Sequence, residues 1–298
     1  METIDNVRIN FNPEQLLLLN FCLAFLMFGV ALDLKPEHFK LLYKQPKAAL
    51  VGFTSQLILL PLLTIGLIFL FQPPVSIALG MLLVSVCPGG NVSNYVTHLA
   101  KGNVALSVLM TSVSTLAATF STPLLFALLT PLVPGGKAFQ QEIYVSPWDM
   151  IITIIQLILI PLSVGMIVNQ QFPRLTQRLL KPIQMLSLLI FAGFVIVAVY
   201  GNWDNITNYI HLVFIIVLIN NGLALLMGYG FAKINRLPFF DAKAIALETG
   251  IHNSGLGLIL IFNFFNGLGG MAMVAAWWGV WHLISAAVLA SIWSRSSK

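Results

Sequence analysis

Residues 75–102 read VSIALGMLLVSVCPGGNVSNYVTHLAKG, an apolar run with Pro88, Gly89 and Gly90 near its middle. A membrane-spanning helix needs about 20 mostly apolar residues, and this run is long enough. Proline removes a backbone donor and paired glycines favour unwinding, so the helix is predicted to break at its centre. Backbone groups freed by a break are very costly in lipid. The polar residues that follow, beginning with Asn91, therefore indicate that the break faces protein, ions or water.

A second apolar segment carries the same kind of interruption. Residues 239–265 read FFDAKAIALETGIHNSGLGLILIFNFF, with three glycines and several polar residues around ETGIHNSG. Within it, Glu248 is the one carboxylate predicted near the bilayer midplane, where a charge is costly and usually functional. Unwound carbonyls and this carboxylate suit a hard cation such as Na⁺, whereas half-helix N-termini suit an anion.

The composition of the chain is that of a protein surrounded by lipid. Of its 298 residues, 58% are hydrophobic and 8% are charged, against about 25% charged in soluble domains. The basic residues form short clusters between apolar stretches, as topology determinants do, and predict no nucleic-acid partner. Cys22 and Cys87 lie far apart without metal or redox spacing. The polar first 15 residues lack the pattern of a signal peptide.

The chain contains nine apolar segments that are candidates for membrane helices. They are residues 14–33, 47–71, 75–100, 103–132, 147–170, 182–200, 208–232, 240–265 and 269–294. With the N-terminus outside and the C-terminus inside, every lysine and arginine except Arg8 and Lys137 falls in an inside segment, which is the expected bias. The sequence therefore predicts an all-α polytopic protein of nine transmembrane helices, integral to the inner or plasma membrane.

The nine spans divide into two halves, residues 1–135 with four spans and residues 136–298 with five. Each span of the first half runs opposite to its counterpart in the second half, with the fifth span unpaired. This pattern predicts an inverted repeat, which is common in secondary transporters. The two interrupted spans occupy matching places in the halves, and such matching interruptions are the best sequence pointer to a transporter's binding site.

Four segments resemble the bile acid:sodium symporter (BASS) family, and the chain is similar to a nine-span bacterial member. They are CPGGNVSN (87–94), HLAKGNVALSVLMTSVSTL (98–116), ETGIHNSGL (248–256) and VWHLIS (280–285). The resemblance implies a core domain that contains two crossed, discontinuous helices, and a panel domain beside it. The core would come from about residues 46–132 and 206–298, and the panel from about 14–33 and 147–200. Transport in such proteins proceeds by movement of one domain against the other.

The resemblance also implies one or two Na⁺ ions and their ligands. The first site would use Ser93, Asn94, Ser107, Thr111 and Glu248. The second would use Gln56, Glu248, the carbonyls of Thr249 and Ile251, and the position of His252. The family has a glutamine there, whereas a neutral imidazole is a poor Na⁺ ligand and can become charged. His252 therefore either weakens or removes the second Na⁺ site, or lets a proton replace that ion.

The function implied by the resemblance is Na⁺-coupled symport of an organic anion, either bile-acid-like or a small carboxylate, by alternating access. The protein is expected to be a monomer in the lipid bilayer, with no enzymatic activity, no catalytic residue and no metal other than Na⁺. The anionic group of the substrate is expected at the half-helix ends, beside Asn91, Val92, Ser93 and Asn253. His282 is either a further substrate contact or a structural hydrogen-bonding residue.

Three alternatives remain open at this point. One is a channel or receptor, although a channel needs a polar path and these polar residues gather at one depth. Another is an intramembrane enzyme built on Glu248 and His252, for which no third ligand or nucleophile stands out. The last is a proton-coupled organic anion carrier that works through His252. Ser114 is expected only to bond to a carbonyl one turn back, and Asn221 is polar at depth without an assigned role.

Overall fold

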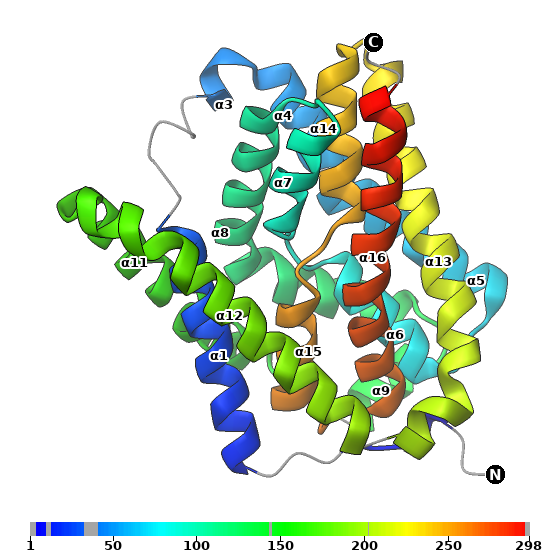
Figure 1. Cartoon of the computed structure of the whole chain (residues 1–298). Helices are drawn as coiled ribbons and strands as arrows, with labels where there is room; N and C mark the ends of the chain where they lie inside the picture. The colour runs from blue at the N-terminus through cyan, green and yellow to red at the C-terminus, as the bar shows by residue number, and fades with distance from the viewer. Residues whose placement is uncertain (1–3, 10–12, 33–40, 143–144, 202, 296–298) are drawn as a thin grey trace.

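The computed structural model describes residues 4–9, 13–32, 41–142, 145–201 and 203–295 (Figure 1). Within these ranges the chain is almost entirely helical and forms no β-strand. Two isolated bridges occur there, one between Arg8 and Leu268 and one between Gly89 and His252. The second bridge lies where the two predicted interruptions meet.

The helices follow one another with short connections. In chain order they are η1 (Ile4–Asn6), α1 (Pro13–Ala31), α3 (Leu41–Lys44), α4 (Pro46–Thr54), η2 (Ser55–Leu59), α5 (Leu60–Phe71), α6 (Val75–Ser85), α7 (Val92–Leu99), α8 (Val104–Leu129), η3 (Thr130–Leu132), α9 (Gly136–Glu142), α10 (Pro147–Ile154), η4 (Ile155–Leu159), α11 (Ile160–Gln171), α12 (Pro173–Gly201), α13 (Trp203–Ile234), α14 (Phe239–Gly250), α15 (Ser254–Phe264) and α16 (Gly269–Arg295).

Six helices of the described chain are long and apolar enough to cross a membrane. They are Glu14–Ala31, Pro46–Phe71, Val104–Leu132, Pro147–Gln171, Val213–Ile234 and Gly269–Arg295. Two further apolar helices, α6 and α15, are shorter. Helix length and apolarity together define an integral membrane protein of the all-α class. Helix α12 begins at Pro173, earlier than the predicted start at residue 182, because the basic segment after Phe172 is itself helical.

Two long helices each widen into one turn of π-helix just before a proline. Segment η2 precedes Pro61 and segment η4 precedes Pro161. Proline cannot donate the backbone hydrogen bond that a regular helix requires at its position. Such π-turns are frequent at functional sites. The first of them carries Gln56, which is fully buried, whereas Gln156 in the second is exposed.

The structure shows both interrupted helices. Helix α6 ends at Ser85 and α7 begins at Val92, while α14 ends at Gly250 and α15 begins at Ser254. Helices α7 and α14 lie together in the upper half of Figure 1, and α6 and α15 lie below them. The two interrupted helices therefore cross at their interruptions.

Close helix packing fixes the lower halves of the interrupted helices. Every residue of α6 from Ser76 to Ser85 is buried, and α6 packs along α16. A Cβ on Gly80 would lie 2.8 Å from the Cα of Met271, so this approach requires a glycine. Helix α1 contacts α15 through paired amides, in which Asn263 Nδ2 donates to Asn20 Oδ1 over 3.0 Å. These contacts give the crossing a rigid support.

Candidate functional site

The two interruptions bind one another through their backbones. The amide of Gly90 donates to the carbonyl of Ile251 over 3.0 Å, and the amide of Asn253 donates to the carbonyl of Pro88 over 2.9 Å. Each unwound segment therefore satisfies backbone groups that the other has freed. This pairing explains how two breaks can exist in an apolar environment, where an unpaired backbone group is costly.

Helix α8 satisfies further backbone groups of the first interruption. Thr122 Oγ1 donates to the carbonyl of Val86 over 2.8 Å, and the amide of Gly89 donates to Ser114 Oγ over 3.2 Å. Ser114 also bonds back to Thr111, as the sequence predicted, at 3.2 Å. Its contact with Gly89 is the part that sequence reasoning missed, because it depends on which helix lies beside the break.

All five residues predicted for the first Na⁺ site meet in one cluster, buried except for the half-buried Asn94, which we call the oxygen cluster: Ser93, Asn94, Ser107, Thr111 and Glu248. The Oε1 atom of Glu248 accepts hydrogen bonds from Ser107 Oγ at 2.5 Å, from Thr111 Oγ1 at 2.8 Å, and from the Ser93 hydroxyl. The Oδ1 atom of Asn94 lies 2.9 Å from Ser107 Oγ and 3.2 Å from Thr111 Oγ1. Three elements, α7, α8 and α14, contribute these side chains.

The oxygen cluster contains more close oxygen–oxygen contacts than hydroxyl protons. Each hydroxyl donates one proton, yet Ser107 and Thr111 each lie within hydrogen-bond distance of both Glu248 and Asn94. A positive charge among these oxygens would relieve the shortage of donors. Carboxylate, amide and hydroxyl oxygens are ligands of hard cations, so the residues present fit Na⁺.

The other oxygen of Glu248 faces the predicted second site. Among the described residues, the buried atoms Glu248 Oε2 and Gln56 Oε1 have no hydrogen-bond partner. A Cβ on Gly89 would lie 2.6 Å from Glu248 Oε2 and 3.1 Å from Gln56 Nε2, so both side chains reach the first interruption. A buried oxygen without a partner is costly in a protein interior unless a donor or a cation lies beside it.

The ring of His252 lies between the two interruptions. Its Nε2 is 2.9 Å from the Thr249 carbonyl oxygen and its Nδ1 is 3.3 Å from the Cys87 carbonyl oxygen. A carbonyl oxygen only accepts, so the shorter contact is a hydrogen bond donated by Nε2. The Ile251 carbonyl accepts from Gly90. Both carbonyls predicted for the second site thus already have donors, and His252 faces backbone oxygens.

The residues predicted to contact substrate lie around the crossing and differ in their exposure. Ser93 is buried in the oxygen cluster, whereas Val92 is 40% exposed and Asn91 is half-buried. Asn253 caps α15 by accepting from the Leu256 amide at 3.0 Å.

Helix α16 brings His282 to the same region. His282 lies one turn after Trp278, and the ring centroid of Trp278 is 5.9 Å from that of His252. His282 is buried, and its Nδ1 has no hydrogen-bond partner among the described residues.

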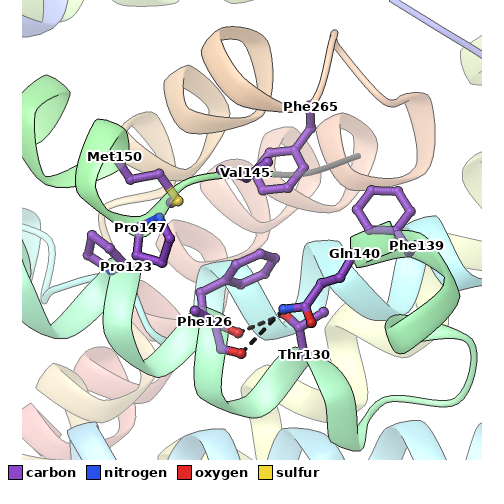
Figure 2. A pocket seen from close by; sticks show the side chains of 10 residues that line it. Pro123, Phe126, Thr130, Phe139, Gln140, Val145, Pro147, Met150 and Phe265 are labelled. Carbon is purple, nitrogen blue, oxygen red and sulfur yellow. Dashed lines mark hydrogen bonds between the residues drawn. The ribbon is translucent and has the colours of Figure 1, made fainter. Parts of the chain in front are cut away.

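A small cavity lies far from the oxygen cluster. Figure 2 shows it at the end of α8, where Phe126, Phe139 and Phe265 surround it. Its volume is about 20 Å³, which is room for one water molecule. The cavity begins at Pro123, roughly 18 Å along α8 from Thr111 at 1.5 Å per residue. It is too small and too distant to be the site of an organic anion.

Two interrupted membrane helices that cross at buried polar groups define the class of secondary transporters. The comparisons with known proteins agree with that class. The chain belongs to the Sodium Bile acid symporter family, whose model matches residues 20–209.

Three relatives illustrate the range of the similarity. The uncharacterized sodium-dependent transporter YocS of Bacillus subtilis is 37% identical over 93% of this chain and 83% of its own length. The chloroplastic probable sodium/metabolite cotransporter BASS1 of Arabidopsis thaliana is 33% identical over 92% of this chain and 66% of its own length. The P3 protein of Homo sapiens is 30% identical over 78% of this chain. The chain spans under two thirds of the plant relative and 48% of the human one.

Proposed function

We propose that this protein is a secondary active transporter that carries an organic anion together with Na⁺. The observation that supports this most is the oxygen cluster, in which the buried carboxylate of Glu248 meets three hydroxyls and an amide oxygen. Relatives of the chain are named as sodium-dependent transporters or sodium cotransporters. Na⁺ would neutralise Glu248 and join α7 and α8 to α14.

The two sides of Glu248 support a proposal for the number of ions. The oxygen cluster offers a complete set of oxygen ligands, whereas on the second side the His252 ring already donates to the Thr249 carbonyl. We therefore propose that one Na⁺ binds at the oxygen cluster and that the second site is weak or absent. Gln56 Oε1 and Glu248 Oε2 would then be the remaining oxygens of that weak site.

The substrate would bind where the crossing opens to the surface of α7. Val92, Tyr95 and Leu99 are 40%, 64% and 43% exposed and form an apolar strip on this short helix. The anionic group would lie beside Asn91 and Asn253 at the starts of α7 and α15, where helix dipoles favour negative charge. The apolar body would lie along the strip, in the crevice between a core domain and a panel domain.

The proposed architecture is the nine-span inverted repeat with alternating access. The six long helices, the interrupted pairs α6–α7 and α14–α15, and α12 would together supply nine spans. The distribution of lysine and arginine supports an external N-terminus and an internal C-terminus. The core and panel would move relative to each other while Na⁺ keeps the crossing closed.

A comparison of salts tests this proposal. A ligand that binds only the folded state at a hundred times its Kd stabilises a protein by about 2.7 kcal/mol. The purified chain in detergent should therefore melt at a higher temperature in NaCl than in the same concentration of KCl. Glu248→Gln should remove the difference, because it removes the charge that binds the cation. Equal melting temperatures of the unaltered chain in both salts would refute Na⁺ coupling.

A matched control lies on the same helix. Asp241 is a second buried carboxylate of α14, two turns before Glu248, and it accepts from Asn103 Nδ2 over 2.7 Å. Asp241→Asn should lower the melting temperature in both salts and keep the difference between them. If Asp241→Asn also melted at the same temperature in NaCl and KCl, Glu248 would have no special part in the salt effect.

The same assay can identify the substrate class. Bile salts and small carboxylates would be screened in NaCl and in KCl. An organic anion that raises the melting temperature more in NaCl than in KCl would be tested next for uptake into proteoliposomes under an inward Na⁺ gradient. Uptake that does not depend on the Na⁺ gradient would contradict symport.

A further inference from the structure

One face of α13 lies directly against the last turn of α14, just before the second interruption. A Cβ on Gly228 of α13 would lie 2.9 Å from Thr249 Oγ1. A Cβ on Gly250 of α14 would lie 2.4 Å from Leu225 Cδ2. Asn221, Leu225 and Gly228 follow one another at helical spacing and so share this face. The end of α14 is therefore packed closely against α13, with the Leu225 side chain against Gly250 and the Thr249 side chain against Gly228.

Asn221 is the polar residue of that face, and its side chain is 1% exposed. Its Nδ2 donates to the carbonyl of Gly250 over 2.8 Å. Gly250 is the last residue of α14, and the final carbonyls of a helix have no partner within the helix. Asn221 thus supplies the donor that this carbonyl would otherwise lack, two residues after Glu248.

Ser285 of α16 fixes which way the Asn221 amide points. Ser285 Oγ donates to Asn221 Oδ1 over 2.6 Å. An amide has an acceptor oxygen on one side and two N–H donors on the other. With the oxygen bound to Ser285, the donor side faces the Gly250 carbonyl. Two hydrogen bonds therefore connect three helices: Ser285 of α16 bonds to Asn221 of α13, and Asn221 bonds to Gly250 at the end of α14.

We propose that Asn221, oriented by Ser285, is a positioning residue for the cation site. By fixing the Gly250 carbonyl it sets the direction in which Glu248 and the neighbouring carbonyls point. The Asn221 side chain forms hydrogen bonds with Gly250 and Ser285, so it would act on the ion through the backbone of α14. This inference rests on the proposed Na⁺ site and adds to it a residue outside the motifs that carry the ligands.

The adjacent residue offers a matched control. Asn220 is 0% exposed, and its side chain lies 3.3 Å from Thr64 Oγ1 of α5. Both asparagines are buried amides on the same turn of α13, and both engage a hydroxyl. The contact of Asn220 is with α5 and does not involve the second interruption. A purely structural role predicts the same consequence for loss of either amide.

The experiment compares Asn221→Leu, Asn220→Leu and Ser285→Ala in the full chain purified in detergent. Melting temperatures are measured over a range of NaCl, LiCl and choline chloride concentrations, which gives apparent affinities for Na⁺ and Li⁺. Loss of a residue that orients metal ligands typically weakens affinity about 10- to 100-fold. We expect Asn221→Leu to weaken Na⁺ by about ten-fold or more and to change the ratio of Na⁺ to Li⁺ affinity. Ser285→Ala should act in the same direction by a smaller factor.

Asn220→Leu should lower the melting temperature in choline chloride as Asn221→Leu does, with unchanged Na⁺ affinity and unchanged ion selectivity. Equal losses of Na⁺ affinity in the two leucine variants would overturn the inference, as would unaltered affinity and selectivity in Asn221→Leu. If Asn221→Leu does not fold, Ser285→Ala decides in the same way. An unaltered chain that melts equally in NaCl and choline chloride would instead refute the proposed function itself, and this inference with it.

Discussion

The two interruptions of this protein have the same backbone problem and different solutions. At the first, hydroxyls of the neighbouring helix α8, from Ser114 and Thr122, pair with the freed amide and carbonyl. At the second, the freed carbonyls accept from nitrogen donors, namely the His252 ring and the Asn221 amide. Glu248 belongs to the last turn of α14, before the second interruption, and its side chain reaches across to Gly89 of the first. The first interruption thus supplies a neutral scaffold, and the helix before the second supplies the charge that would attract Na⁺.

The comparison also explains why the interruptions must touch. Glu248 lies in the last turn of α14, whereas Ser93 lies in the first turn of α7, and their side chains bond directly. The paired backbones bring these two residues together from positions 155 residues apart in the chain. A change that separates the interruptions should therefore abolish cation binding even when every ligand remains.

The largest expected effect comes from adding one methyl group at the first interruption. In Gly89→Ala the new Cβ would lie 2.6 Å from Glu248 Oε2 and 3.1 Å from Gln56 Nε2. Contacts this short require the carboxylate or the break to move, so we expect the difference in melting temperature between NaCl and KCl to disappear. Gly257→Ala is the control, because its Cβ would meet ordinary contacts, the nearest at 3.6 Å. A full Na⁺ response in Gly89→Ala would show that the two interruptions need not fit so closely.

A smaller effect is expected when one ligand of the oxygen cluster is removed. Thr111→Val keeps the shape of the side chain but loses the hydroxyl that lies 2.8 Å from Glu248 Oε1. Hydrogen bonds to charged groups contribute about 1.5–3 kcal/mol, so Na⁺ affinity should fall about 10- to 100-fold. Ser112→Ala should leave it unchanged, because Ser112 Oγ donates to the Val108 carbonyl one turn back. Equal Na⁺ affinities in the two variants, measured by titration with NaCl, would argue against the oxygen cluster as the site.

Changes in the scaffold should lower stability more than affinity. Thr122→Val leaves the Val86 carbonyl without its donor, and an unsatisfied buried group costs about 1–3 kcal/mol. We expect a lower melting temperature in KCl and a nearly unchanged gain on adding NaCl. Thr119→Val should be close to neutral, because the buried Thr119 hydroxyl has no partner among the described residues. A Thr122→Val variant as stable as the unaltered chain would show that the Thr122 hydroxyl does not stabilise the first interruption.

The smallest expected effect concerns the number of ions. In His252→Gln, an amide oxygen replaces the ring that donates to Thr249, so a second Na⁺ should bind beside Gln56 and Glu248. The Hill coefficient for Na⁺ in uptake or in melting should rise from about one toward two, the number of ions then bound. A coefficient near two in the unaltered chain, independent of pH, would contradict both interpretations of His252. A coefficient that changes with pH would favour replacement of the second Na⁺ by a proton.

The sequence predicted the centre of the site better than its surroundings. Pro88, Gly89 and Gly90 located the first interruption, and Glu248 stood out as a carboxylate within an apolar run. The resemblance to the symporter family then named the members of the oxygen cluster, and the structure brings all of them together. The interruptions could be located because broken helices are local properties of the chain, whereas the role of the oxygen cluster in binding Na⁺ stays a prediction.

The contacts that support the site could not be predicted in the same way. Ser114, Thr122 and Asn221 are ordinary polar residues in long helices, and their partners lie 25, 36 and 29 residues away. Only the packing of α8 and α13 against the interruptions gives them a role. The helical spacing of Thr111, Ser114 and Thr122 on α8 was a weak signal that one polar face of α8 lies against the break.

The most direct measurement of the central proposal is equilibrium binding of radioactive Na⁺ to the purified chain and to Glu248→Gln. We expect one Na⁺ bound per chain in the unaltered protein, displaced by excess unlabelled NaCl but not by KCl. We expect no specific Na⁺ binding in Glu248→Gln. Two tightly bound ions in the unaltered protein would contradict the assigned number, and Na⁺ retained by Glu248→Gln would contradict the oxygen cluster as the binding site.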